Sequence, residues 1–367
     1  MEQHASPDRH RDAGAAVSGS PAGMAVARRG WGVRLQIWLG AAIALGTIYL
    51  AARAVDFGQL FRALQEVRLP FVLVALGTAL GTNVLKAARW RALFHPRPAR
   101  LSLLQLTNLI VVGQAVNFYI PARLGELVRA YLTGEEAGVS KVYALGTIAA
   151  EKLIDIIVLA LLIAAMLPFL ALPDWLAGRI GPLFLTALAV CIVIAGLVGG
   201  RRLIWRPIEW GLGLLPAAWG ERWRTRLRAG LDGLSALGSP RAAAAVWGWT
   251  IAFWLVAAFT NYLLLLAFDL PASALMAFFL LAVLQAGVAV PSTPGKIGVF
   301  HYLCILGLGV FNVSATTGLA YGLVLHALVV GGVSLWAAAA LWRRSWNLRR
   351  LAEASRDGSD QLEGRQI

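Results

Sequence analysis

Charge is the scarcest property of this sequence. Only 14% of its 367 residues are Asp, Glu, Lys or Arg, whereas hydrophobic residues make up 59%. Soluble domains usually carry about 25% charged residues, so the composition excludes an ordinary soluble protein of this length. The apolar residues also form repeated blocks of about 20, the length that an α-helix needs to cross a bilayer. The chain is therefore predicted to be an all-α integral membrane protein.

Acidic residues are scarce as well, since 19 Asp and Glu face 33 Lys and Arg, which gives a net charge of +14. The arginines cluster in short connections between apolar blocks, which is the pattern of loops retained on the cytoplasmic side of a membrane. No nucleic-acid-binding motif accompanies them. The expected partners are therefore membrane lipids, and nucleic acid is not expected.

Cysteine is nearly absent, and Cys191 and Cys304 lie in apolar blocks without a C-x-x-C motif. This spacing predicts neither a metal site nor a structural disulfide. His301 and His326 also lie singly in apolar blocks, where hydrogen-bonded structural histidines are the usual case. We expect neither a metal nor a cofactor.

Three parts are predicted along the chain. Residues 1–33 are a disordered cytoplasmic tail, residues 34–345 a polytopic membrane domain, and residues 346–367 a polar tail. The tail is too long and polar for a signal-peptide n-region, so the block 35–52 is interpreted as an uncleaved signal-anchor span. Cleavage near residues 51–52 is the alternative.

Two further segments carry amphipathic patterns. In 57–69, apolar residues recur at helical spacing, which predicts a helix in the membrane interface. The segment 199–241 interleaves tryptophan with eight arginines. It is predicted to be a basic cytoplasmic helix on anionic lipid, with a solvated connector as the alternative.

Charge decides how the apolar blocks cross. If every block crossed fully, the basic segment 199–241 would lie outside, against the positive-inside rule. The conflict disappears if 101–120 dips in, breaks at Pro121 and returns, and if 272–290 and 297–310 form a second dip from the opposite side. About six full spans then remain, with both termini cytoplasmic in a bacterial inner membrane. Those spans are 35–52, 70–85, 142–167, 182–198, 242–268 and 317–342.

The two dips resemble each other in sequence. Each contains Gln-Ala, then proline six or seven residues later, then glycine four residues after that, and then a charge, Glu126 or Lys296. Inverted repeats with broken helices are typical of transporters, whose substrate site lies near the midplane. An inverted repeat is therefore indicated, with chance similarity of small-residue patterns as the alternative.

Broken backbone at membrane depth requires protein or water around it, so the breaks predict a polar cavity. Freed N–H groups at the starts of half-helices bind anions, which suits a phosphate-bearing headgroup. The residues predicted to break the helices are Pro121, Gly125, Pro291, Pro294, Gly295 and Gly298.

Charges inside a predicted span are costly and usually functional. Glu151, Lys152 and Asp155 lie in the block 142–167, and the two carboxylates, four residues apart, share one helix face. Their candidate partners are Arg123, Arg129 and Lys296. The cluster is either a cavity that binds a headgroup or relays a proton, or a set of ion pairs that pins the dips.

The remaining charges carry their own alternatives. A functional role is favoured for Arg123 and Glu126. Arg129 equally fits an interfacial position. Arg89 and Arg91 flank Trp90 at a predicted span end, where interface anchoring is the default and headgroup contact the alternative.

Four motifs together resemble the lysylphosphatidylglycerol synthase transmembrane-region family, also called the flippase-like domain family. They are R-W-R at 89–91, N-F-Y-I-P-A-R-L-G-E-L-V-R at 117–129, E-K-L-I-D at 151–155 and P-S-T-P-G-K-I-G at 291–298. The resemblance covers most of residues 35–345 and adds Asn117 to the candidate substrate-binding residues. It implies moving or handling polar lipids, including aminoacylated phospholipids, hopanoid-associated lipids and lipid-linked sugars.

The chain departs from the family pattern at three positions. Lys152 stands where the family commonly has arginine, Lys296 where it often has the second glycine of Pro-Gly-Gly, and His301 where a glutamate is common. The family's synthase activity resides in a separate soluble domain. Only about 25 residues follow the last predicted span, fewer than the roughly 50 of the smallest usual domains, so no enzyme activity is expected.

The sequence thus predicts a flippase-like transporter that moves or binds a polar lipid. Without a nucleotide-binding motif, it would depend on an ion gradient, a partner or the lipid gradient. The alternative is a non-catalytic subunit or scaffold for a lipid-modifying enzyme. A glycosyltransferase is less favoured, because no Asp-x-Asp site is present. Small residues along several spans fit either internal packing or a homodimer.

Overall fold

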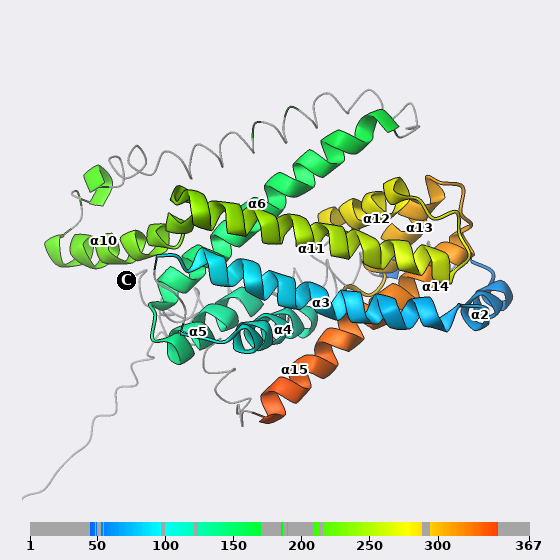
Figure 1. Ribbon diagram of the computed structural model, residues 1–367, viewed down its shortest axis with the longest axis horizontal. Helices are drawn as coiled ribbons and strands as arrows, with labels where there is room; N and C mark the ends of the chain where they lie inside the picture. The colour runs from blue at the N-terminus through cyan, green and yellow to red at the C-terminus, as the bar shows by residue number, and fades with distance from the viewer. Residues whose placement is uncertain are drawn as a thin grey trace, which may run out of the picture.

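The computed structural model shows a bundle of helices (Figure 1). It describes residues 45–47, 49, 53, 55–96, 100–120, 124–169, 185, 189, 209–212, 214, 216–287 and 294–343. All regular elements in these ranges are helices, in agreement with the predicted fold class. The predicted spans 35–52 and 182–198 fall almost entirely outside the described residues.

Four helical stretches are long and apolar enough to cross a membrane. They are α3 (Leu69–Leu93), α6 (Lys141–Met166) with the 3₁₀ turn η1 (Leu167–Phe169), α11 (Pro240–Ala267), and α14 (Ala315–His326) continued by the π-type turn η4 (Ala327–Gly331) and α15 (Gly332–Arg343). Each stretch has 25–29 residues, more than the roughly 20 that the hydrocarbon layer requires. The predicted spans at 70–85, 142–167, 242–268 and 317–342 are confirmed as helices of this kind.

The predicted end of the second span was wrong. Helix α3 continues eight residues past Leu85 to Leu93, so the basic residues Lys86, Arg89 and Arg91, at which the span was predicted to end, belong to the same helix. The helix stops just before the His95–Pro96 pair, because a residue that precedes proline disfavours the α conformation. The charges did not end the helix, because Arg89 is paired inside the protein.

Both predicted breaks are present as interruptions between short helices. The first separates α4 (Leu103–Tyr119) from α5 (Gly125–Ala137). The second separates α12 (Ala274–Gly287) from α13 (Val299–Gly309), with the 3₁₀ turn η3 (Pro294–Lys296) between them. These helices have 11–17 residues, too few to cross a bilayer alone. Pro121, Arg123 and Pro291 lie outside the described residues, and the re-entrant course stays a prediction.

Helices α3 and α11 run antiparallel through the centre of the bundle. The Arg68 N–H donates to the Ala267 carbonyl at 3.0 Å at one end, and Ser235 Oγ donates to the His95 carbonyl at 3.0 Å at the other. Figure 1 places α4 and α5 toward the end of α3, and α12 and α13 toward the end of α11. The two broken segments thus approach from opposite ends, and the order long helix, broken pair, long helix occurs twice.

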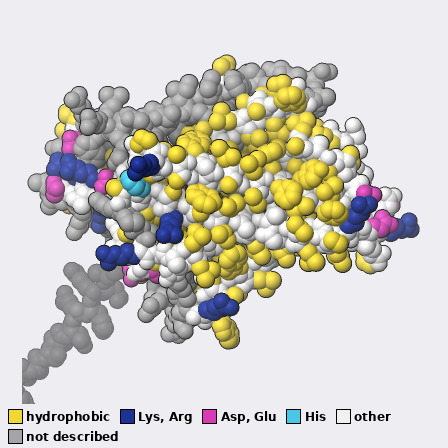
Figure 2. Space-filling model, viewed as in Figure 1, with side chains coloured by type: hydrophobic (Ala, Val, Ile, Leu, Met, Phe, Trp, Pro, Cys, Tyr) yellow, Lys and Arg dark blue, Asp and Glu magenta, His cyan; other side chains and the backbone are white. Residues whose placement is uncertain are grey.

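The face in Figure 2 carries apolar side chains across its middle and charged side chains toward both ends. Helix α2 (Phe57–Gln65), the predicted amphipathic helix, has no buried residue and begins at the side-chain cap of Asp56. Within the predicted basic segment, α10 (Ala217–Asp232) is helical. It packs closely on α6, where the backbones of Gly146 and Gly230 meet.

The first broken segment depends on a contact between two glycines. A methyl group added to Gly125 would overlap the carbonyl oxygen of Gly113 and lie 2.6 Å from Asn117 Oδ1. We expect Gly125→Ala to lower the free energy of unfolding by about 2–3 kcal/mol, because neither backbone can yield without separating α4 from α5. Unfolding in mixed detergent micelles measures this loss. Gly77→Ala on α3 is the matched control, since its methyl group meets no atom within 4 Å, and equal losses in both variants would contradict the assignment.

Candidate functional site

The start of α5 is held by a side chain from α4. Asn117 Oδ1 accepts the Gly125 N–H at 2.8 Å, and Asn117 Nδ2 donates to Glu126 Oε2 at 3.1 Å. Glu126 Oε1 in turn lies 3.4 Å from Lys152 Nζ on α6. The structure therefore joins three predicted site residues across the first break.

A second set of charges forms an ion-pair chain, which comprises buried Arg129, Glu151 and Arg89 and partly buried Asp155. Arg129 Nη2 lies 2.6 Å from Glu151 Oε2 and Nη1 lies 3.3 Å from Oε1. Arg89 Nη2 lies 3.3 Å from Glu151 Oε1, and Arg89 donates to both oxygens of Asp155 at 2.6 and 3.1 Å. The prediction that both carboxylates share one helix face is confirmed, because Arg89 bridges them.

The surroundings of the arginines correct two expectations. Arg89 was expected by default at the membrane interface, but its side chain is 0% exposed. Arg129, for which an interfacial position was the alternative, is also buried, and its guanidinium carbon lies 3.6 Å from the Trp90 ring centroid. Trp90 is fixed by donating to Thr147 Oγ1 at 2.9 Å. The R-W-R motif therefore supports the charge chain.

The second break differs from the first in its backbone. Gly295, Lys296 and Gly298 all have positive φ, at 71°, 58° and 89°. Glycine adopts this conformation readily, whereas a residue with a Cβ pays about 1 kcal/mol or more. Lys296 thus occupies a strained position that the family pattern gives to glycine, and its Nζ lies 5.6 Å from the Phe118 ring centroid at the first break. Among the predicted partners of Glu151 and Asp155, Arg129 pairs with Glu151, and Lys296 pairs with neither.

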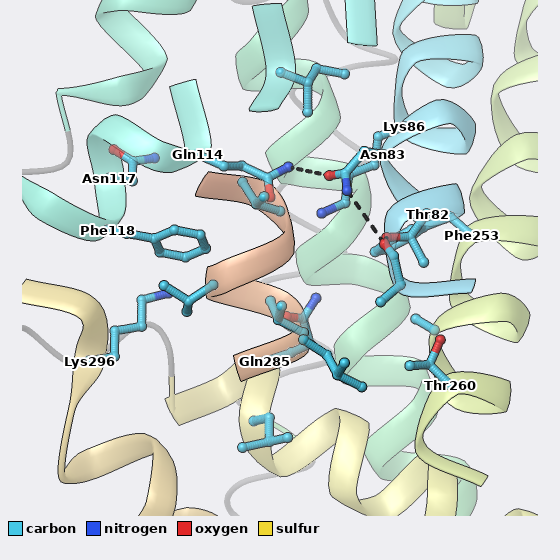
Figure 3. Close-up of a pocket in the computed structure, with 18 of the residues that line it drawn as sticks. Thr82, Asn83, Lys86, Gln114, Asn117, Phe118, Phe253, Thr260, Gln285 and Lys296 are labelled. Carbon is cyan, nitrogen blue, oxygen red and sulfur yellow. Dashed lines mark hydrogen bonds between the residues drawn. The ribbon is translucent and has the colours of Figure 1, made fainter. Parts of the chain in front are cut away.

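A cavity of about 320 Å³ lies where the two breaks meet. Lys296 and Phe118 lie on one side of it, and Lys86, Thr82 and Phe253 on the other (Figure 3). The predicted residues Asn117, Gly125, Glu126, Arg129, Glu151, Lys152, Asp155, Gly295 and Lys296 all line it. Arg123 lies outside the described residues.

Several lining residues were not predicted as part of the site. Gln114 Nε2 donates to Asn83 Oδ1 at 2.9 Å, and Gln285 lines the cavity from the second broken segment. Both glutamines belong to the Gln-Ala pairs of the sequence repeat, which was the available signal. Lys86 directly follows the predicted span 70–85, and its position in α3 emerges only from the length of that helix.

Among the described side chains, the cavity has an excess of positive charge. Lys86, Arg129, Lys152 and Lys296 line it, with Arg89 behind them, against Glu126, Glu151 and Asp155. Each carboxylate has a basic partner within 3.4 Å. Lys86 has no ion pair within the described part of the chain, and its Nζ lies 4.9 Å from the Phe253 ring centroid. The cavity is thus suited to a negatively charged group.

Arg89 and Asp155 allow a direct test of the ion-pair chain. We expect Arg89→Met to lower the free energy of unfolding by about 3–5 kcal/mol, because buried Glu151 loses one of its two arginines and partly buried Asp155 loses its partner. Arg89→Met with Asp155→Leu removes both charges and leaves Glu151 paired with Arg129. This double variant is expected to recover most of the loss, as measured by unfolding in mixed micelles. A double variant as unstable as Arg89→Met would contradict the pairing.

The comparisons with known proteins agree with this picture. A family model described as the lysylphosphatidylglycerol synthase TM region matches residues 37–337. Searches of curated proteins and of solved structures gave no match. The matched model covers the transmembrane region alone, and no catalytic domain was found in the chain. This chain is a multi-pass membrane protein that belongs to the lysylphosphatidylglycerol synthase transmembrane-region family.

Proposed function

We propose that this protein binds the headgroup of an anionic polar lipid in the cavity between the two breaks and moves the lipid across the bacterial inner membrane. The observation that carries the proposal is the position of the charges. They meet where two broken segments approach from opposite ends of a bundle of apolar helices. On this proposal the segments are re-entrant hairpins of an inverted repeat, and the protein is a transporter and not an enzyme.

Membrane physics supports a solvated cavity at this place. Interrupted backbone and ionised side chains are costly in hydrocarbon and persist only where protein or water surrounds them. Gly125 and Gly295 at the two breaks both line the cavity, and so does the charge cluster. A transport route needs such a place, whereas ion pairs that only pin helices together require no cavity.

Size and charge favour a lipid headgroup over a whole lipid. Sites for small molecules typically hold about 300–1,000 Å³, and 320 Å³ is at the lower limit of that range. Such a space accommodates a headgroup while the acyl tails stay in the bilayer. Lys86 and Lys296, on opposite sides of the cavity (Figure 3), are placed to contact a phosphate group between them.

The orientation follows from the distribution of basic residues. Helix α10, with its arginines, lies at the same end of the bundle as the end of α3 (Figure 1). At the opposite end, Arg68 pairs with Asp269 at 2.8 Å, which balances its charge. By the positive-inside rule, we propose that the α10 end faces the cytoplasm, and that both termini are cytoplasmic as well.

The variant Lys296→Gly tests the role of the cavity in transport without lowering the stability of the protein. The change removes a cationic side chain from the cavity and relieves the left-handed strain, so thermal stability is expected to stay equal or rise. Translocation of acyl-labelled phosphatidylglycerol in liposomes is expected to fall about tenfold, the cost of one lost charged hydrogen bond. Dithionite quenching of the outer-leaflet label measures the rate. Lys141→Gln, which removes an exposed lysine paired with Glu135, is the matched control and keeps wild-type activity.

Two results would overturn the proposal. The first is folded wild-type protein in liposomes that moves labelled lipid no faster than empty liposomes do, while a reference scramblase moves it; the scaffold function would then be favoured. Equal translocation by wild type and Lys296→Gly would show that lipid headgroups do not pass through this cavity.

A further inference from the structure

Two histidines from different helices form hydrogen bonds with the backbone of the second break. His301 on α13 and His326 on α14 have ring centroids 4.9 Å apart. The Gly298 N–H donates to His301 Nδ1 at 3.4 Å, and His326 Nε2 lies 2.6 Å from the Gly295 carbonyl oxygen. The backbone 295–298, which carries Lys296 into the cavity, is therefore fixed by this histidine pair.

These bonds determine where the imidazole protons lie. A carbonyl oxygen only accepts, so His326 Nε2 carries a hydrogen and donates it. A backbone N–H only donates, so His301 Nδ1 carries none, and the His301 ring is neutral with its hydrogen on Nε2. That Nε2 is buried and has no partner among the described residues, and the residue is only 8% exposed. The arrangement in the structure, in which both histidines hold the segment 295–298, is the closed one. It excludes a second proton from His301.

Three carboxylates, Glu126, Glu151 and Asp155, line the same cavity as His326, and each already has a basic partner within 3.4 Å. Within the described ranges, no carboxylate contacts either ring. Helix α12 contributes no titratable side chain. Helix α2 carries Arg62 and is flanked by Asp56 and Glu66, and the Asp56 N–H donates to Thr316 Oγ1 near the start of α14. The other titratable groups on the elements around the pair are Lys296 on η3, Tyr302 and Cys304 on α13, Tyr321 on α14, Arg241 and Tyr262 on α11, and Lys86, Arg89 and Arg91 on α3. A proton on His301 would therefore add positive charge beside His326 and Lys296.

The segment held by the pair is also strained. Lys296 has a φ of 58°, in the left-handed region. Such a conformation persists only where the surroundings impose it. Loss of the Gly298–His301 hydrogen bond would remove one of the restraints on this backbone.

We propose that His301 is a proton-binding group that controls access to the cavity. In an open arrangement, the segment 295–298 moves away and His301 meets water. His301 can then bind a proton that the closed arrangement excludes, so acid favours the open arrangement. Because free imidazole titrates near pH 6.5, the ratio of open to closed protein rises up to tenfold per pH unit below about 6.5. As regulation of lipid movement, this inference rests on the proposed function.

His326 has a different role, which supplies a matched variant. Its Nε2 donates to Gly295 whether the ring is neutral or charged, so it positions the segment without being the sensor. His326→Gln keeps a donor, and His301→Asn keeps an acceptor at the place of Nδ1, but neither new side chain titrates. The two variants each remove one imidazole, and only His301→Asn removes the proposed sensor.

The test follows the mobility of the segment in liposomes without measuring lipid transport. A nitroxide is attached at Ile297→Cys, a position that is 50% exposed, in a background with Cys191→Ser and Cys304→Ala. Between pH 7.5 and 5.5 the mobile fraction of the spectrum is expected to rise several-fold. His301→Asn should abolish this rise and His326→Gln should keep it. A label at Leu335→Cys, 75% exposed on α15, reports non-specific effects of pH and should not respond.

Each outcome decides the inference. The absence of a pH response in wild type, a full response in His301→Asn, or loss of the response in His326→Gln would each overturn it. A folded His301→Asn protein is verified by gel filtration, and if it does not fold, His326→Gln still decides. If the label responds as expected but no lipid is translocated at any pH, the proton-dependent segment stands and the proposed function fails. If lipid moves equally at all pH values, the function stands and the coupling fails.

Discussion

Glu151 is the residue at which three separate parts of the bundle are joined. Its carboxylate, 5% exposed, accepts from Arg129 on α5 and from Arg89 on α3, while Glu151 itself belongs to α6. A carboxylate buried in a membrane protein is tolerated only with such partners. The short helix α5 cannot cross a bilayer, and its position depends on this ion pair and on the Asn117 cap.

The same constraint accounts for the cavity. Ion pairs and glycine contacts bring α4 and α5 against α3 and α6 from one end of the bundle. The histidine pair and the turn at Gly295 hold the second broken segment at the cavity from the other end of the bundle. Where the two breaks meet, backbone and charged side chains need polar surroundings, and the space between them is lined by both repeats of the element order. The excess of basic side chains gives this space its preference for anions.

Local patterns in the sequence predicted much of this arrangement. Four described spans and both breaks follow from apolar length and from proline and glycine spacing, which depend only on neighbouring residues. The shared face of Glu151 and Asp155 follows from helical geometry. Local patterns could not predict that Arg89 is the partner of Asp155, because the two residues lie 66 positions apart in the chain. Basic residues at the end of an apolar block look the same in sequence whether they bind lipid or pair with a distant carboxylate, so Arg89 was expected to anchor the span end at the membrane interface.

The second break shows a similar limit. Its glycines were predictable, but the contact of His326 with the Gly295 carbonyl joins positions 31 apart, and no periodic pattern reports such a contact. The sequence showed Lys296 at a position where the family often has glycine. The structure explains why glycine suits this position, because the residue has a positive φ of 58°.

The central claim is that the cavity holds the headgroup of an anionic lipid. The most direct measurement is mass spectrometry of the lipids that co-purify in mild detergent with wild type, with Lys86→Gln in the cavity, and with Arg224→Gln on α10. The account predicts one class of anionic lipid enriched over the bulk membrane in wild type and Arg224→Gln, and reduced about tenfold in Lys86→Gln. The same bulk profile from all three proteins would contradict it.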